Sequence, residues 1–199
     1  MVARRELISE REERRALGLA ARQPASAGKL ADLLATLGKR VVAAALEDRR
    51  VQRRLAETRY RVIGVDYAEE KPSGSARDPV RLAEVGFYDY DRDVLVVAVV
   101  RPRTGAVMRL EERKGLQPAP SHEEVERARE LALSDPKLAR LRRRRDMRVS
   151  ALPAEAPHDL HRRVHVYFAS GGRRAQPLGD AVVDLSADRI VSVMPRERR

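Results

Sequence analysis

Apolar residues recur along this chain with two different periods. From Lys29 onward they return at spacings of three and four residues, which is typical of a helix with one buried stripe. The stripe consists of Leu30, Leu33, Leu34, Leu37, Val41, Val42, Ala45 and Leu46. Farther on, Val62 to Tyr67 and Ala83 to Tyr90 are short runs separated by a polar loop with Pro and Gly, which predicts two strands. The first half therefore reads as a helix followed by a sheet.

The run Val94 to Val100 is apolar at every position. A strand with one solvent-exposed face alternates between apolar and polar residues, so an unbroken run indicates a strand covered on both faces. The second cover is either the other half of the chain or another subunit. A hairpin then closes this half at Gly105, where a turn favours glycine.

The second half begins with a helix signal. Ser121 and Glu124 have the spacing of a capping box, in which each side chain accepts a hydrogen bond from the other residue's backbone N–H. The helix pattern continues to Ala132, and Asp135-Pro136 is expected to restart it. Four strands are predicted to follow, at Met147 to Leu152, Arg163 to Ala169, Gly179 to Leu185 and Arg189 to Met194.

The two halves are diverged copies of one unit. Residues 41–110 recur in the same order at 124–193, and the hairpin at 98–110 matches that at 181–193 most clearly. The duplication predicts an α+β fold of two tandem units, each a helix with a four-stranded antiparallel sheet. The expected domains are a charged N-terminal helical arm at 1–26, unit 1 at 27–115 and unit 2 at 116–199, with a Pro-containing linker at 115–120 between the units.

This order of elements resembles the small N2 and N3 domains of copper amine oxidases. The matching residues are the helix start Pro120 to Val125 and the closing hairpin Asp180 to Val193. The resemblance implies two cystatin-like units that pack or dock and do not catalyse. In that family the reaction belongs to a separate domain with a quinone-forming Tyr in an Asn-Tyr-Asp/Glu string and three copper-binding His. The nearest string here, Asp89-Tyr90-Asp91, lacks the Asn, so no oxidase residue carries over.

The chain is basic, with 41 Lys and Arg against 30 Asp and Glu and a net charge of +11. This excess is either functional, because arginine pairs with carboxylates and phosphates, or a compositional bias. The densest run is a candidate patch for an anionic partner. It comprises Arg140, Arg142, Arg143, Arg144, Arg145 and Arg148. No aromatic stacking platform or DNA-reading motif accompanies the run, so nucleic acid is the weaker alternative.

No residue pattern points to chemistry. The absence of cysteine excludes disulfides and thiolate sites. His158, His161 and His165 cluster, but residues four apart on a strand lie ~13 Å from each other, too far to share one ion. A bend at Leu160 would bring His158 and His161 together, but the neighbouring arginines oppose a cation, so solvated loop and strand histidines are expected. Paired acids such as Glu123-Glu124 are interpreted as surface or cap residues. We therefore predict no catalytic residue, no metal site and no cofactor.

These patterns favour a non-enzymatic protein-protein interaction or assembly module, with a protein partner or a homo-oligomer. The candidate interface combines the tyrosine string with the apolar run: Tyr88, Tyr90, Val94, Val96, Val97 and Val99. The alternatives are a nucleic-acid-associated basic protein and an accessory or remnant of a copper amine oxidase-like protein. Without a signal peptide or an apolar stretch of about 20 residues, a cytoplasmic protein with no membrane contact is expected.

Overall fold

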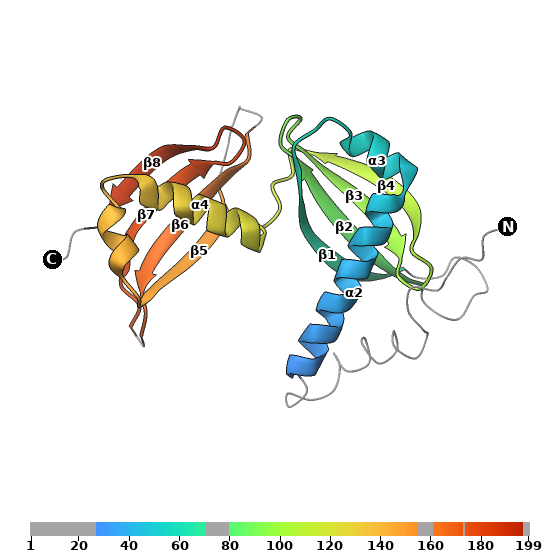
Figure 1. Cartoon of the computed structure of the whole chain (residues 1–199), viewed down its shortest axis with the longest axis horizontal. Coiled ribbons are helices and arrows are strands. Elements are labelled where there is room, and N and C mark those ends of the chain that lie inside the picture. The colour runs from blue at the N-terminus through green and yellow to red at the C-terminus, as the bar shows by residue number, and fades with distance from the viewer. Residues whose placement is uncertain (1–26, 71–79, 155–160, 173, 197–199) are drawn as a thin grey trace. The chain divides into compact units, whose positions relative to one another are not determined.

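A computed structural model describes residues 27–70, 80–154, 161–172 and 174–196 of the chain. The helical arm predicted for residues 1–26 lies outside these ranges, and so does His158. The described residues form helices and two four-stranded sheets, which confirms the predicted α+β fold (Figure 1). None of the described helices has the length and apolar character needed to cross a membrane.

The first sheet is an antiparallel meander in the order β1-β2-β3-β4. Its strands are β1 (Tyr60–Glu70), β2 (Val80–Asp89), β3 (Val94–Arg101) and β4 (Ala106–Lys114). Helices α2 (Ala27–Glu47) and α3 (Arg49–Leu55) lie on one face of it (Figure 1). The break between the helices is stabilised by Asp48, whose carboxylate caps α3 by accepting from the Arg50 backbone N–H at 2.8 Å.

The predicted apolar stripe and the doubly covered strand are both present. Leu37, Val41 and Ala45 of α2 are buried, and Leu34, Val42 and Leu46 are partly buried. The side chains of Leu30 and Leu33 lie outside those that the structure describes. Every residue of β3 from Val94 to Val100 is buried too, and only Arg101 at its end is exposed. The unbroken apolar run thus reflects burial on both faces of the strand, as its lack of alternation predicted.

The second sheet is antiparallel, in the order β5-β6-β7-β8. Its strands are β5 (Met147–Pro153), β6 (Arg163–Ser170), β7 (Pro177–Asp184) and β8 (Arg189–Pro195). Helix α4 (His122–Ser134) lies across one face of it (Figure 1). The side chains between helix and sheet are mostly aliphatic, apart from one phenylalanine: Ala128, Ala132, Val164, Val166, Phe168, Ala181 and Val183 are all buried.

The start of α4 confirms the predicted capping box at Ser121 and Glu124. Its end differs slightly from the prediction. After Asp135-Pro136 the chain forms a short 3₁₀ helix, η2 (Ala139–Arg143), in place of a restarted α-helix. Proline cannot donate the hydrogen bond that a continuing α-helix needs. The segment still buries Leu138 and Leu141.

The chain divides into two compact units. The second unit contains residues 114–199 together with Thr58–Ile63 and Tyr88–Leu95, and the first contains the remainder. The tip of the β2–β3 hairpin therefore packs with the second unit, although it is continuous with the first sheet. The domain boundaries expected from the duplication stay a prediction.

Leu138 and Gly179 form a packing pair that can be tested. Leu138 is fully buried, and a methyl group added at Gly179 would lie 2.8 Å from its Cδ2 atom and 3.2 Å from the Met194 carbonyl oxygen. We expect Leu138→Ala to lower the free energy of unfolding by about 2–5 kcal/mol through the cavity it leaves. Gly179→Ala should cost about 1–3 kcal/mol through overpacking.

Because Leu138 causes the tightest clash, Gly179→Ala should cost less in the Leu138→Ala background than in the wild type. Urea denaturation of the two single variants and the double variant measures this coupling. Leu152→Ala is the control, since Leu152 is 58% exposed and its truncation should change stability by only about 0.5 kcal/mol. Strictly additive costs would contradict the assigned contact.

Candidate functional site

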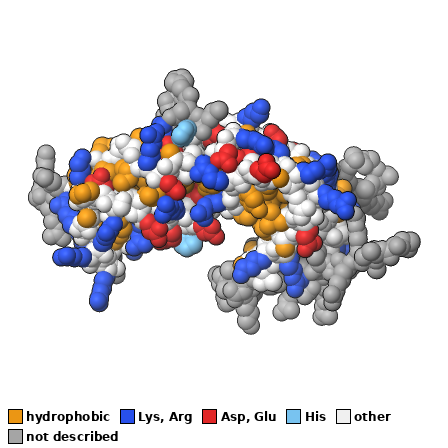
Figure 2. Space-filling view, turned by 45° about the horizontal axis from the view of Figure 1, so that its top comes forward, with side chains coloured by type: hydrophobic (Ala, Val, Ile, Leu, Met, Phe, Trp, Pro, Cys, Tyr) orange, Lys and Arg blue, Asp and Glu red, His pale blue; other side chains and the backbone are white. Residues whose placement is uncertain are grey.

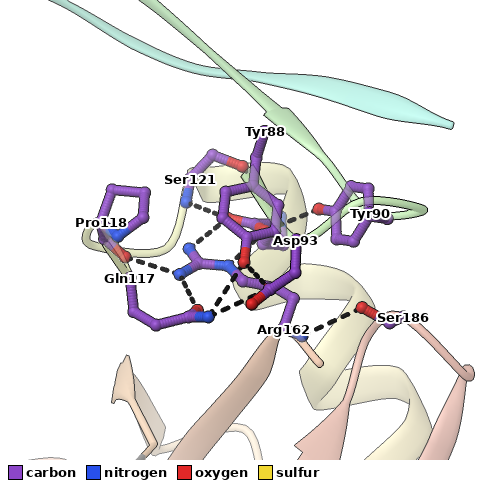
Figure 3. Close-up of polar contacts among 9 residues, drawn as sticks. Tyr88, Tyr90, Asp93, Gln117, Pro118, Ser121, Arg162 and Ser186 are labelled. Carbon is purple, nitrogen blue, oxygen red and sulfur yellow. Dashed lines mark hydrogen bonds and ion pairs between the residues drawn. The ribbon is translucent and has the colours of Figure 1, made fainter. Parts of the chain in front are cut away.

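A buried arginine organises the largest polar cluster in the second unit. Arg162 directly precedes β6, and its side chain is fully buried. Its guanidinium binds the Glu124 carboxylate in a fork, with Nε donating to Oε1 at 3.0 Å and Nη2 to Oε2 at 3.1 Å. Nη1 donates to the Gln117 side-chain oxygen at 3.0 Å and to the Pro118 carbonyl at 2.8 Å (Figure 3). The cluster thus ties helix α4, strand β6 and the linker before α4 to one side chain.

Two tyrosines close the other side of this cluster. The Tyr90 hydroxyl donates to Glu124 Oε1 at 2.6 Å, and the guanidinium carbon of Arg162 lies 4.8 Å from the centre of the Tyr88 ring. The two rings meet edge to face at 5.4 Å. The Tyr88 hydroxyl donates to the Asp93 carboxylate and accepts from the Gln117 amide at 2.9 Å. Both tyrosines therefore point inward (Figure 3).

Glu124 takes part both in the capping box of α4 and in the Arg162 cluster. Its Oε2 accepts the Ser121 backbone N–H at 2.9 Å as half of the capping box, while its own N–H donates to Ser121 Oγ at 3.2 Å. The same carboxylate also receives Arg162 and Tyr90. Glu124 is a helix cap, as predicted. It is not a surface residue, because only 1% of it is exposed. A negative group is also favoured at this helix N-terminus.

The electrostatics of the cluster hold each group in one protonation state. Burial alone would raise the pKa of Glu124, but the hydrogen bonds and charge of Arg162, with help from Tyr90, outweigh it and lower that pKa. Burial, together with the neighbouring carboxylates Asp93 and Glu124 respectively, raises the pKa of Tyr88 and of Tyr90. At neutral pH the carboxylate is thus charged and both phenols are neutral. The arrangement is suited to holding structure and offers no free base or nucleophile.

Two histidines of the second unit, His161 and His165, contact carboxylates. His161 Nδ1 lies 2.7 Å from Asp184 Oδ2, and His165 Nε2 lies 2.8 Å from Asp180 Oδ2. The Tyr167 hydroxyl and His165 Nδ1 are 2.8 Å apart, and the two rings stack at 4.1 Å. The histidines were expected to be solvated, yet they are partly buried and paired. Within the described ranges, no three His, Asp, Glu or Cys side chains are grouped as a metal site requires.

The face of the second sheet turned away from α4 carries a different set of side chains. We call it the outer face of the second sheet. One row of strand partners across it runs Ser150, Tyr167, Asp180 and Met194, and the neighbouring row runs Leu152, His165, Val182 and Ser192. Leu152, Tyr167 and Met194 are 58%, 37% and 55% exposed. Within the second unit, helix α4 lies on the opposite face of the sheet (Figure 1).

The candidate interface residues lie inside the chain. Tyr88, Tyr90, Val94, Val96, Val97 and Val99 are all buried. Strand β2 ends at Asp89, so the tyrosine string turns inward at the hairpin and does not continue as a two-faced strand. Burial within the chain accounts for the apolar run without a second subunit. An interface role for these six residues stays a prediction.

The arginine run lies on η2 and the segment leading into β5. Arg140, Arg142, Arg143, Arg145 and Arg148 are exposed, and Arg144 is half-buried. Arg144 forms a two-point pair with Asp146 at 3.0 and 3.1 Å, and Arg140 donates to the Arg196 carbonyl at 3.2 Å. On the face shown in Figure 2, basic and acidic side chains are interspersed. A role for this run in binding an anionic partner stays a prediction.

Comparisons with known proteins found similarity only at the level of solved structures. No family model and no curated protein matches the chain. Among solved structures, the chain is similar to a copper-containing benzylamine oxidase from Hansenula polymorpha, with a TM-score of 0.46 and 17% identity over 71% of this chain. The chain spans about a quarter of that protein, since the match covers 26% of its length. This likeness assigns neither a family nor a function to the chain.

Sequence reasoning identified Glu124 and the two tyrosines but missed Arg162. The capping-box spacing made Glu124 visible because its partner lies three residues away. Arg162 lies 38 residues from Glu124, in a stretch where arginines are common and nothing sets this one apart. Only the packing of α4 against β6 brings the two together.

Removing the buried guanidinium should destabilise the protein strongly. We expect Arg162→Met to lower the free energy of unfolding by about 3–5 kcal/mol, because Glu124 would be left buried and unpaired. Arg162→Lys should recover only part of this loss, since a lysine cannot form the two-point contact. Denaturant unfolding followed by circular dichroism measures both. Arg127→Met is the control, because the Arg127–Asp188 pair is exposed and should contribute less than about 1 kcal/mol.

The lowered pKa of Glu124 predicts a pH dependence of stability. A carboxylate whose folded pKa lies below the unfolded value of 4.5 stabilises the fold above that value, and the effect is lost as pH falls through the folded pKa. Glu124→Gln should therefore be less stable than the wild type at pH 7, and the difference should shrink as pH falls below 4.5. Thermal melts from pH 7 to pH 2.5 test this. Glu126→Gln, which alters an exposed pair with Arg129, should leave the wild-type profile unchanged.

Proposed function

We propose that this chain is a non-enzymatic protein-binding module that docks a protein partner on the outer face of the second sheet. The observation that supports the proposal is the exposure of Leu152, Tyr167 and Met194 on that face, at 58%, 37% and 55%. These three side chains are spread over strands β5, β6 and β8, and exposed apolar groups on a sheet face are a feature of interaction sites.

The composition of the outer face suits a protein interface. Tyrosine, methionine and arginine are enriched at such interfaces, and all three occur here. Tyr167 is held in place by its stack and hydrogen bond with His165, so little side-chain entropy would be lost when it binds. Ser150 and Ser192 lie in the same rows and add hydrogen-bonding groups between the apolar ones.

The Arg162 cluster supports binding over catalysis. Its charged and phenolic groups form hydrogen bonds with one another. These bonds hold α4, the linker or the hairpin tip in place. The accessory or remnant role implied by the resemblance stays a prediction, because a fold shared at 17% identity does not transfer an activity.

A pair of charged substitutions tests the docking face. We expect Leu152→Asp with Met194→Asp to abolish a cross-link between the chain and its partner in the cells that produce it, because both carboxylates would have to be desolvated in the interface. Both positions are exposed, so stability should change by only about 0.5 kcal/mol at each. Cross-linking followed by mass spectrometry provides the measurement.

Met108→Asp is the matched control, because Met108 is 47% exposed but lies on β4 of the first sheet. The control should retain the cross-linked partner at wild-type yield. A partner that both variants retain equally, or the recovery of no cross-linked protein from the wild type, would contradict the proposal.

A further inference from the structure

We infer that the partner binds through an acidic segment that also carries apolar residues, with its carboxylates paired to arginines beside the outer face of the second sheet. The inference rests on the proposed docking face and specifies the chemistry of its occupant. It follows from three features of the second unit: the free arginines, the occupied carboxylates and the nature of the exposed apolar groups.

Two arginines at the β5 side of this face have no carboxylate partner within the described residues. Arg148 follows the alternation of β5 and lies on the same face as Ser150 and Leu152. Arg145 lies two residues before that strand. Both are exposed, and neither has an ion pair among the residues that the structure describes. Their charges are available to a bound anion.

The carboxylates of the same face do not neutralise these arginines. Asp180 is 8% exposed and contacts His165, with Arg196 Nε at 4.0 Å. Asp184 is fully buried and contacts His161, with Arg189 Nε at 3.7 Å. Both acids are thus below the surface and already engaged. The surface left for a partner has exposed apolar groups on β5, β6 and β8 and is basic at its β5 side.

This charge distribution favours an acidic occupant over a second copy of the chain. Two copies meeting through this face would bring the same unpaired arginines together. Each copy also carries a net charge of +11. Like charges brought together across an interface oppose association, whereas complementary charges accelerate it and set its register. An acidic segment neutralises the arginines that a second copy would repel.

The exposed apolar groups favour a protein over nucleic acid. Bases bind exposed sheets mainly by stacking on aromatic rings. Here the rings of Tyr167 and His165 are stacked on each other at 4.1 Å, and the more exposed groups are the aliphatic Leu152 and the thioether of Met194. Aliphatic and thioether side chains pack well against leucine or phenylalanine of a partner peptide. They offer no flat ring on which a nucleic-acid base could stack.

Fluorescence anisotropy with defined probes tests the inference on the full chain. The probes are a fluorescein-labelled peptide of alternating glutamate and leucine, the same peptide with lysine for glutamate, and labelled oligothymidylate. The Glu/Leu peptide should bind, and raising the salt from low to high should weaken it. Arg145→Glu with Arg148→Glu should weaken its binding roughly tenfold through lost pairing and added repulsion.

A charge-matched control is available on the first sheet. Lys39 on α2 and Arg101 at the end of β3 are both exposed, so Lys39→Glu with Arg101→Glu changes the net charge equally without touching the second unit. This control should weaken peptide binding less than about twofold through the long-range field alone. Equal weakening by both double variants would overturn the assignment of the site to the β5 side.

The remaining outcomes separate the inference from the proposed function. If the Lys/Leu peptide bound as well as the Glu/Leu peptide and Leu152→Asp abolished both, the docking face would stand and the acidic partner would be excluded. If oligothymidylate bound more tightly and Arg145→Glu with Arg148→Glu abolished it, the face would bind nucleic acid and the inference would fail. A Glu/Leu peptide that did not bind would also overturn it, while the cross-linking result would still decide the proposed function.

Discussion

The ion pair between Arg162 and Glu124 is the interaction on which the second unit depends. Two charges removed from water cost several kcal/mol each, and only dense hydrogen bonding can offset that cost. The pair is accordingly densely bonded: the guanidinium donates to Glu124, Gln117 and Pro118, and the carboxylate accepts from Arg162, Tyr90 and Ser121. Because these partners come from different segments, the start of α4, the linker and the approach to β6 are held together.

The rest of the second unit is arranged around that constraint in two layers. Below α4 the sheet is lined by small aliphatic residues, with Phe168 the single aromatic side chain among them. Aliphatic cores of this kind bury less area per residue than aromatic ones, so specific polar contacts contribute a larger share of what defines the fold. The tyrosines Tyr88 and Tyr90 add aromatic surface, and they do so around the arginine.

The two faces of the second sheet therefore have different tasks. The inner face holds the helix and the ion pair, where every polar group is matched. The outer face combines exposed apolar side chains with a stacked Tyr167–His165 pair and carboxylates drawn below the surface. Binding requires a surface whose groups are still available, and that condition is met on the outer face and the arginines beside it. The Arg162 cluster contains the residue types that active sites use, yet its side chains already bond to one another and stabilise the fold.

Local patterns in the sequence determined most of the secondary structure. The three- and four-residue spacing of apolar residues marked α2, the capping box marked α4, and the unbroken run from Val94 to Val100 indicated a doubly covered strand, because each signal is carried by neighbours along the chain. The duplication likewise predicted two helix-and-sheet units, and the structure has them.

The long-range partnerships were decided only by the tertiary structure. Nothing in the sequence distinguishes Arg162 from the arginines around it, since its selection depends on Glu124 arriving 38 residues away when α4 packs on β6. The same holds for Tyr88 and Tyr90. The sequence predicted that they form a contact surface, whereas the hairpin directs them inward. The exposure of Leu152 and Met194 is also a tertiary outcome, because apolar strand residues are expected on the buried face and only the packing of α4 on the opposite face leaves these two exposed.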